Sequence, residues 1–456
     1  MSVSLFDSVL STSAMQAVFD DAALVRAMLR FEAALARAQA DEGMMAPSAA
    51  EAIERSCAAF PLDLPALIAA GRRAGSIAIP LVKALTGSVA QDDPQAALLV
   101  HQGSTSQDVI DTAMVLVTGE ALALLDAGLA RLCAALCALA ERHLDTPLLA
   151  RTLLQPAQVS SFGFKLAGWA APLVRARRQL RESGRRALQL QLGGAVGTLS
   201  AMDGHGPAVA ARMAAQLQLA CPASAWHSQR DEWVRLGLEV AVLTGSLGKI
   251  ATDLALMAQG EIGELAEPTA AGRGGSSAMP HKRNPVAAMT ALAAAARTPH
   301  AAGALLGAMG QQHERGLGNW QAELAEWPGL FSCADGALAA LNEAFAGLQV
   351  NAVRMRANID GQRGLVFAEA VAGYLARFIG RPAAHALLEQ LSGEAIASGR
   401  QLAEVAADAV DADPQLRRHI NLEHWQRLFD PVAAAAPGAA AGRALLLHLA
   451  SIEETP

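Results

Sequence analysis

The chain has 456 residues and carries 36 Lys and Arg against 43 Asp and Glu, for a formal net charge of -7. This acidic balance excludes nucleic acid as a bulk partner, although it leaves room for a local basic pocket. Hydrophobic residues make up 52% of the chain but aromatic residues only 4%, so the apolar content is mainly Ala and Leu, which favours helix over sheet.

The N-terminal segment, residues 1–7, has neither the basic region nor the apolar run of a signal peptide. Apolar stretches such as 114–117 are interrupted by polar residues before they reach the length of a membrane span. Five Cys, an odd number in a long chain, do not indicate a disulfide framework. We therefore expect a soluble, cytoplasmic protein that does not contact a membrane.

Helical periodicity dominates the chain and predicts an all-α fold. The segment 21–40 reads as one amphipathic helix, and much longer helical patterns follow after residue 108. These long patterns cover 109–143, 160–192, 231–265, 285–309 and 322–347. We expect three helical domains, of which the central one is a long five-helix bundle, with bounds 1–108, 109–350 and 351–456. An Ala-, Gly- and Pro-rich stretch of low complexity occupies 433–441.

Three polar loops stand out against this helical background, at 101–108, 151–158 and 274–285. Taken singly, each has an ordinary structural interpretation: a helix cap formed by Ser106 or Asp108, a turn, and a flexible linker. No phosphate-binding loop or zinc-protease motif accompanies them. Cys133 and Cys137 lie one helical turn apart, but no matching His or Cys pair follows, so core packing is preferred to a metal site.

Together the three loops resemble the conserved blocks of the fumarase/aspartase superfamily. The third loop reads Gly-Ser-Ser-x-Met-Pro-x-Lys-x-Asn-Pro from Gly275 to Pro285 and matches every fixed position of that superfamily's signature. The other two blocks look like His-x-Gly-x-Thr-Ser-x-Asp at 101–108 and Arg-Thr-x-x-Gln-Pro-Ala-Gln at 151–158. The resemblance implies an all-α homotetramer with a helical core, active sites shared between subunits, a small polycarboxylate substrate, and neither cofactor nor metal.

The resemblance also assigns roles to individual residues. Enzymes of this superfamily add or remove a group β to a carboxylate, so they need a base at carbon and stabilisers for the charge that develops on the carboxylate. By resemblance Ser276 is the catalytic base, with Lys282 and loop N–H groups stabilising its alkoxide. The candidate substrate-binding residues are Thr105, Ser106, Gln155, Met279, Asn284, His281, Arg315 and His101.

Leu153 departs from the family pattern. Lyases of this family that release an amine usually carry His at this position, and a leucine cannot donate a proton. An amine or alkoxide leaving group needs protonation, whereas a carboxylate, with a pKa of about 4, departs unassisted at neutral pH. Leu153 therefore indicates a carboxylate as leaving group or nucleophile, and intramolecular attack of a carboxylate on an alkene is lactonisation.

Further stretches resemble one branch, the 3-carboxy-cis,cis-muconate cycloisomerases of aromatic (protocatechuate) degradation. They lie at 31–40, 79–85, 226–231 and 313–323. The implied reaction forms 4-carboxymuconolactone, with Ser276 as the proton donor. Three alternatives stay open: a 3-sulfomuconate cycloisomerase, an adenylosuccinate-lyase-like β-elimination enzyme, and an inactive helical scaffold. His227 and Arg230 are either carboxylate anchors or, for Arg230, half of an ion pair with Asp231.

Overall fold

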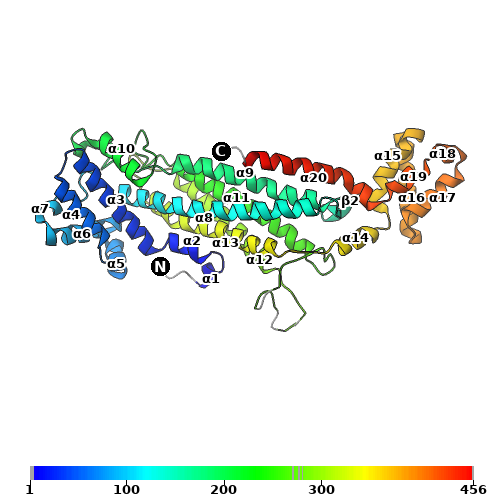
Figure 1. The fold of residues 1–456 in the computed structure, drawn as a ribbon, viewed down its shortest axis with the longest axis horizontal. Helices are drawn as coiled ribbons and strands as arrows, with labels where there is room; N and C mark the ends of the chain where they lie inside the picture. The colour runs from blue at the N-terminus through cyan, green and yellow to red at the C-terminus, as the bar shows by residue number, and fades with distance from the viewer. Residues whose placement is uncertain (1–4, 270–271, 276–277, 280, 454–456) are drawn as a thin grey trace. The chain divides into compact units, whose positions relative to one another are not determined.

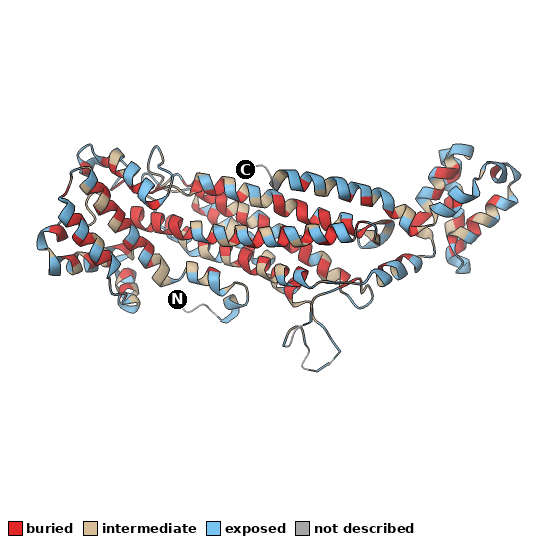
Figure 2. Cartoon of the chain, in the orientation of Figure 1, coloured by how far each residue is buried: buried red, intermediate tan, exposed pale blue. Residues whose placement is uncertain are grey.

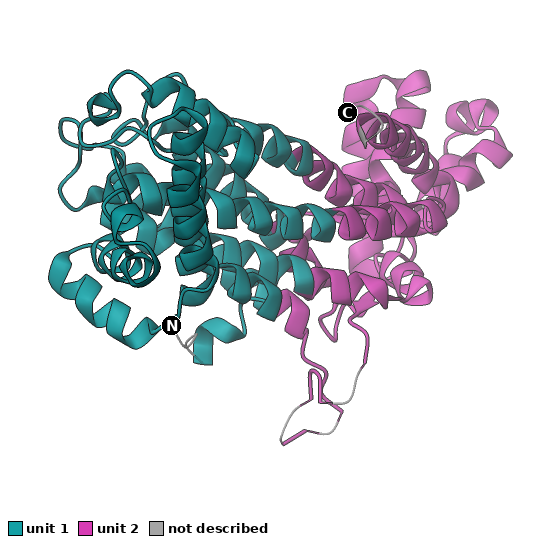
Figure 3. Ribbon diagram, turned by 60° about the vertical axis from the view of Figure 1, so that its left-hand side comes forward, with its two compact units in different colours: residues 1–129, 176–248, 290–339 teal, residues 130–175, 249–289, 340–456 magenta. Residues whose placement is uncertain are grey.

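The structure is a computed structural model that describes residues 5–269, 272–275, 278–279 and 281–453. The described chain is mainly helical, as the sequence predicts (Figure 1), and it also contains two short antiparallel strand pairs. It divides into two compact units, coloured separately in Figure 3: unit 1 holds 1–129, 176–248 and 290–339, and unit 2 holds 130–175, 249–289 and 340–456. The predicted three-domain division stays a prediction.

Five long helices correspond to the five long sequence patterns. They are α8 (Ser106–Arg142), α9 (Phe162–Ala187), α11 (Asp231–Met257), α12 (Val286–Ala308) and α13 (Asn319–Ala346). Figure 2 shows buried residues running along these helices. Within unit 1, Trp233 of α11 stacks on Trp327 of α13 with ring centroids 3.9 Å apart, and the Trp327 indole donates to Thr118 Oγ1 of α8 at 2.9 Å. Large aromatic rings thus join three helices whose other core residues are mostly Ala and Leu.

The rest of unit 1 is built around α3 (Asp21–Asp41), which matches the predicted amphipathic helix. Its first turn is capped by Asp20, whose carboxylate accepts from Ala23 N at 2.6 Å, and its buried face includes Met28, Phe31 and Leu35. The smaller helices are α1 (Leu5–Ser8), α2 (Ser13–Val18), α4 (Pro47–Ala58), α5 (Leu64–Ala74), α6 (Ala78–Asp92), α7 (Pro94–Ala97) and α10 (Gly206–Leu217), with a 3₁₀ turn η1 (Ser200–Met202).

Unit 2 contains a β-hairpin that the sequence analysis missed, formed by β1 (Pro147–Thr152) and β2 (Gln155–Ser161). Helix α20 (Pro431–Glu453) packs on β2, and it contains the whole low-complexity stretch 433–441. The remaining elements are β3 (Leu265–Ala266), β4 (Gln349–Val350), α14 (Ala352–Asp360), η2 (Leu365–Phe367), α15 (Ala368–Ile379), α16 (Arg381–Ser398), α17 (Leu402–Ala412), α18 (Pro414–His419) and α19 (Leu422–Leu428). Helices α15 to α19 enclose their own core around Leu375, Leu402 and Trp425.

Among the described residues, three helices are long and apolar enough to cross a membrane by length and composition, which corrects the expectation that polar residues interrupt every such stretch. They are α8, α11 and α20, and only 39%, 50% and 22% of their most apolar windows are buried within this chain. A single copy therefore leaves much apolar helical surface uncovered.

Small residues allow α11 to approach its neighbours closely, which yields a stability prediction. A Cβ atom at Gly237 would lie 2.6 Å from Leu305 Cδ1 and 3.0 Å from the Trp327 ring, whereas a Cβ at Gly87 of α6 would meet nothing within 4 Å. We expect Gly237→Ala to lower the free energy of unfolding by about 1–3 kcal/mol through overpacking. Gly87→Ala should leave it unchanged or raise it by up to ~1 kcal/mol. Urea denaturation measures both, and equal behaviour of the two variants would contradict the prediction.

Candidate active site

The first polar block is organised by one buried carboxylate, that of Asp108. It accepts from Thr105 N at 3.0 Å, so Asp108 completes the N-terminus of α8 as the sequence suggested. The same carboxylate accepts from Gly193 N at 3.0 Å and Gly194 N at 2.9 Å, and its Oδ1 lies 2.7 Å from His227 Nε2. Asp108 is fully buried, so four groups from three chain segments replace its water.

One turn further along α8, Asp111 belongs to a buried cluster with Arg230 and Glu323. Arg230 donates to both Asp111 oxygens, at 2.8 and 3.1 Å, and to both oxygens of Glu323, one at 3.2 Å. Burial lowers the pKa of the Arg230 guanidinium, but the two carboxylates outweigh it and raise that pKa. Burial raises the pKa of the Glu323 carboxyl, which Arg230 offsets only in part.

This cluster corrects both hypotheses for Arg230. Its guanidinium does not pair with Asp231, and it is fully buried among protein carboxylates rather than presented to a substrate. Gln107, Gln191 and Trp320 also donate to Asp111, at 3.1, 3.1 and 2.8 Å. Arg230 therefore holds α8 to α13 beneath the first block.

Arg315 closes the first block from the loop before α13. Its Nη1 donates to Thr105 Oγ1 at 2.9 Å, and its Nη2 donates to the carbonyl oxygens of Gly194 and Ala195 at 3.2 and 2.8 Å. The guanidinium thus fixes the hydroxyl that the sequence analysis expects to hold a substrate carboxylate.

His101 lies at the start of the same block, in the left-handed backbone region with a φ of 63°. Its Nδ1 is 2.6 Å from Glu32 Oε1 of α3. Burial lowers the pKa of the His101 imidazole, but the hydrogen bond and charge of Glu32 outweigh it, so the pKa is raised. The contact with Glu32 therefore favours the protonated form of the ring.

The second block forms the turn of the β1–β2 hairpin in unit 2. Thr152 pairs with Gln155, so Leu153 and Leu154 alone make the turn, with φ of 52° and 64°. Two-residue turns of this hand favour Asn and Gly, and a Leu in left-handed backbone costs roughly 1–2 kcal/mol. Both leucines are exposed, Leu153 by 96%. The turn is anchored by Arg151, which makes a two-pronged ion pair with buried Glu264 at 2.8 and 3.1 Å.

The third block is a loop whose two ends are held together. Asn284 N donates to Gly274 O at 2.8 Å, and a Cβ on Gly274 would lie 2.7 Å from Asn284 O. Glu267 accepts from Ala287 N and Ala288 N at 2.9 Å, which caps α12 directly after the loop. Met279, His281 and Lys282 are exposed between these anchors.

The structure places the predicted residues in two groups. His101, Thr105, Ser106 and Arg315 come together in unit 1, while Gln155, Met279, His281, Lys282 and Asn284 belong to unit 2. Ser276, the predicted base, lies outside the described residues. Sequence reasoning missed Glu32 and Glu323. For Glu32 a signal existed, because it is a carboxylate next to Phe31 on the apolar side of the helix.

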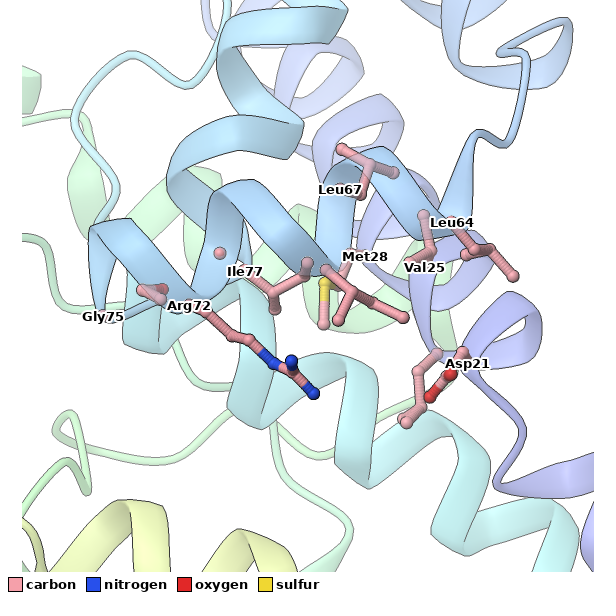
Figure 4. Close-up of a pocket in the computed structure, with 12 residues that line it drawn as sticks. Asp21, Val25, Met28, Leu64, Leu67, Arg72, Gly75 and Ile77 are labelled. Atoms are coloured by element: carbon pink, nitrogen blue, oxygen red, sulfur yellow. The ribbon is translucent and has the colours of Figure 1, made fainter. Parts of the chain in front are cut away.

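A cavity of ≈ 430 Å³ opens elsewhere in unit 1, between α3 and α5 (Figure 4). Apolar side chains such as Val25, Met28 and Leu67 line it, with Asp21 and Arg72 at its polar side, and it includes none of the predicted site residues. Among the described residues, no group of three His, Cys, Asp or Glu side chains is placed to hold a metal ion.

Comparison with known proteins identifies the class. A family described as "Lyase" matches residues 9–298, and the chain belongs to this family, which confirms the resemblance to the fumarase/aspartase superfamily. The chain is 47% identical over 429 residues to 3-carboxy-cis,cis-muconate cycloisomerase of Bradyrhizobium diazoefficiens, covering 94% of each chain. It is 41% identical to nitrosuccinate lyase of Streptomyces davaonensis, covering 95% of this chain and 93% of that one.

A solved structure agrees with these relatives. The 3-carboxy-cis,cis-muconate lactonizing enzyme of Pseudomonas putida superposes with a TM-score of 0.92 at 41% identity, covering 98% of this chain and 99% of that one. The all-α fold predicted from the sequence is therefore confirmed.

Because Asp108 joins three segments, its charge should matter more than that of a surface carboxylate on the same helix. We expect Asp108→Asn to lower the free energy of unfolding by roughly 3–5 kcal/mol, since the amide cannot replace a buried anion that accepts from backbone N–H groups. The matched control is Asp126→Asn in α8, where the carboxylate pairs with Arg177 and Arg181 nearer the surface. Its cost should stay below about 1 kcal/mol in the same chemical denaturation experiment.

The left-handed turn predicts that a better turn sequence stabilises the protein. We expect Leu153→Asn combined with Leu154→Gly to raise the free energy of unfolding by about 1–2 kcal/mol, because both residues tolerate positive φ. Leu317→Asn is the control, since Leu317 is 90% exposed but does not have positive φ. A double variant no more stable than the wild type would show that the leucines make compensating contacts.

Proposed function

We propose that this chain is a cycloisomerase that converts 3-carboxy-cis,cis-muconate into 4-carboxymuconolactone, in the protocatechuate branch of aromatic degradation. The names of its relatives support this assignment, at 47% identity for the Bradyrhizobium enzyme. The observation in this chain that carries it is Leu153. An apolar side chain occupies the place where amine-releasing lyases carry a proton donor, so the site suits a carboxylate nucleophile.

The proposed reaction assigns a role to each block. One substrate carboxylate attacks the alkene, and Ser276 delivers a proton to the adjacent carbon α to a carboxylate. Lys282 and loop N–H groups stabilise the Ser276 alkoxide and the charge on that carboxylate. The carboxylates are held by Thr105, Ser106, Gln155 and Asn284, with Met279, His281, Arg315 and His101 around them. One carboxylate becomes an ester, so each turnover takes up one proton from solvent.

The same proposal includes a cytoplasmic homotetramer with shared active sites. Its support is the apolar surface of α8, α11 and α20 that a single chain leaves uncovered. Burying such helical faces against further copies would remove them from water.

A nitrosuccinate-type elimination is the second candidate. The 41% identity to nitrosuccinate lyase favours it, and nitrite, like a carboxylate, leaves without prior protonation. Leu153 is compatible with both reactions, so only substrates separate them.

One assay tests the assignment. The wild-type protein should remove the diene absorbance of 3-carboxy-cis,cis-muconate while leaving 3-sulfomuconate, adenylosuccinate and nitrosuccinate unchanged or much slower. Ser276→Ala should abolish turnover and leave the oligomer intact by size-exclusion chromatography, because alanine has no hydroxyl to give up the proton. Turnover of nitrosuccinate alone would replace the proposal with the second candidate. A Ser276→Ala variant with a near-normal rate would refute the role of the serine. If the wild-type protein turned over none of the four substrates, the inactive-scaffold alternative would replace the proposal.

A further inference from the structure

We propose that Glu32 is a positioning residue that holds His101 as an imidazolium, so that His101 supplies a fixed positive charge for one carboxylate of the substrate. This inference rests on the proposed function for its ligand, a polycarboxylate. The pairing itself is independent of the reaction.

Two side chains of helix α3 contact the turn at 101–104. Glu32 Oε1 lies 2.6 Å from His101 Nδ1, and Gln39 Nε2, two helical turns further on, donates to Gln102 O at 2.8 Å. Both side chains are buried, Glu32 to 1% exposure. Positions 32 and 39 share one face of the helix, so α3 holds both the ring of His101 and the backbone carbonyl of the next residue, Gln102.

The Glu32 carboxylate has few partners of its own. Its second oxygen, Oε2, is buried and has no hydrogen bond among the described residues. A buried carboxylate with so few partners depends on an adjacent positive charge, and His101 is the group in contact with it. A protonated imidazole therefore stabilises Glu32, and Glu32 in turn keeps the imidazole protonated.

The other titratable groups facing this pair do not compete for the role. On α4, burial and then the charges of Glu32 and Glu54 raise the pKa of the Cys57 thiol to about 12, so the thiol is neutral. Glu54 is itself paired with Arg37. On α8, Asp108 adds a second negative charge that favours His101 in its protonated form.

The other side of the ring is open to a ligand. The His101 side chain keeps 19% exposure, and Ser104 Oγ lies 3.0 Å from Nδ1 and 3.3 Å from Nε2. His101 is four residues before Thr105, whose hydroxyl Arg315 holds. With Nδ1 in contact with Glu32, the Nε2–H of a protonated ring can donate a charge-assisted hydrogen bond to a carboxylate.

The pair predicts a pH dependence with a definite sign. The pKa of His101 is raised in the folded protein, so its positive charge is present below that pKa and is lost as pH rises through it. Glu32→Gln keeps the shape and a hydrogen-bond acceptor but removes the charge. The alkaline limb of kcat/KM should then move to lower pH by about one unit or more, which lowers kcat/KM about tenfold at a pH above both limbs. The loss should appear mainly in KM.

The matched control is Glu54→Gln, which removes a carboxylate from the neighbouring helix α4 without touching His101. It should leave the alkaline limb in place. A second variant, His101→Lys, should replace the imidazolium, which loses its proton as pH rises, with an ammonium that keeps it. The value of kcat/KM should then stay constant between about pH 6 and 9.

A substrate-free measurement separates this proposal from the assigned reaction. The His101 ring is titrated by NMR in wild type and in Glu32→Gln, with its signal assigned from its absence in His101→Lys. A lower titration midpoint in Glu32→Gln supports the pairing even if muconate is not the substrate. If the titration midpoint of His101 is the same in Glu32→Gln as in wild type, the pairing is overturned. If the midpoint falls but the alkaline limb of kcat/KM stays in place, the role of His101 toward substrate is overturned. If Glu32→Gln does not fold, the His101→Lys variant decides. The proposal is overturned if the alkaline limb of kcat/KM is still present in that variant.

Discussion

The first block depends on one buried anion at the N-terminus of α8. The Asp108 carboxylate accepts from the backbone of Thr105, Gly193 and Gly194 and faces His227. Three chain segments meet at this one side chain. Gly193 lies 85 residues from Asp108 along the chain, and His227 lies 119 residues from it. Because a buried carboxylate must have its oxygens satisfied, the loop at 193–194 cannot move away from α8 without exposing or orphaning a charge. The same carboxylate fixes the backbone of Thr105, and so it also fixes the position of the Thr105 hydroxyl.

A second layer of charge lies one helical turn below. There the Arg230 guanidinium lies between the Asp111 and Glu323 carboxylates. Such clusters contribute less to net stability than their contacts suggest, because each ion has lost its water. Their value here is geometric, since they fix α8, α13 and the segment before α11 in one register. Arg315 and His101 are the residues that we propose as positive charges for a polycarboxylate substrate.

The turn of the second block contains strained backbone. Leu153 and Leu154 occupy left-handed backbone at an exposed turn, where Asn and Gly would fold more easily. The chain therefore keeps an unfavourable apolar turn at the position where, by the family resemblance, lyases that release an amine usually carry His. Retained strain of this kind is typical of functional sites. It agrees with a reaction whose leaving group or nucleophile is a weak base, as the names of both the muconate and the nitrosuccinate relatives suggest.

The sequence alone determined the long helices, the family and the identity of the three blocks. Ala- and Leu-rich periodicity extends over several turns, and the signature at 275–285 matches position by position, so neither needs distant contacts. It missed the β1–β2 hairpin because Leu-Leu is not a turn signal, and it misassigned Arg230 because the nearest carboxylate in sequence, Asp231, is not its partner. Only the tertiary structure decided the distant partners of Arg230, Asp108 and His101, which lie 69 to 119 residues away along the chain. Pairings of this kind are set by which helix faces pack together, and local sequence carries no record of that.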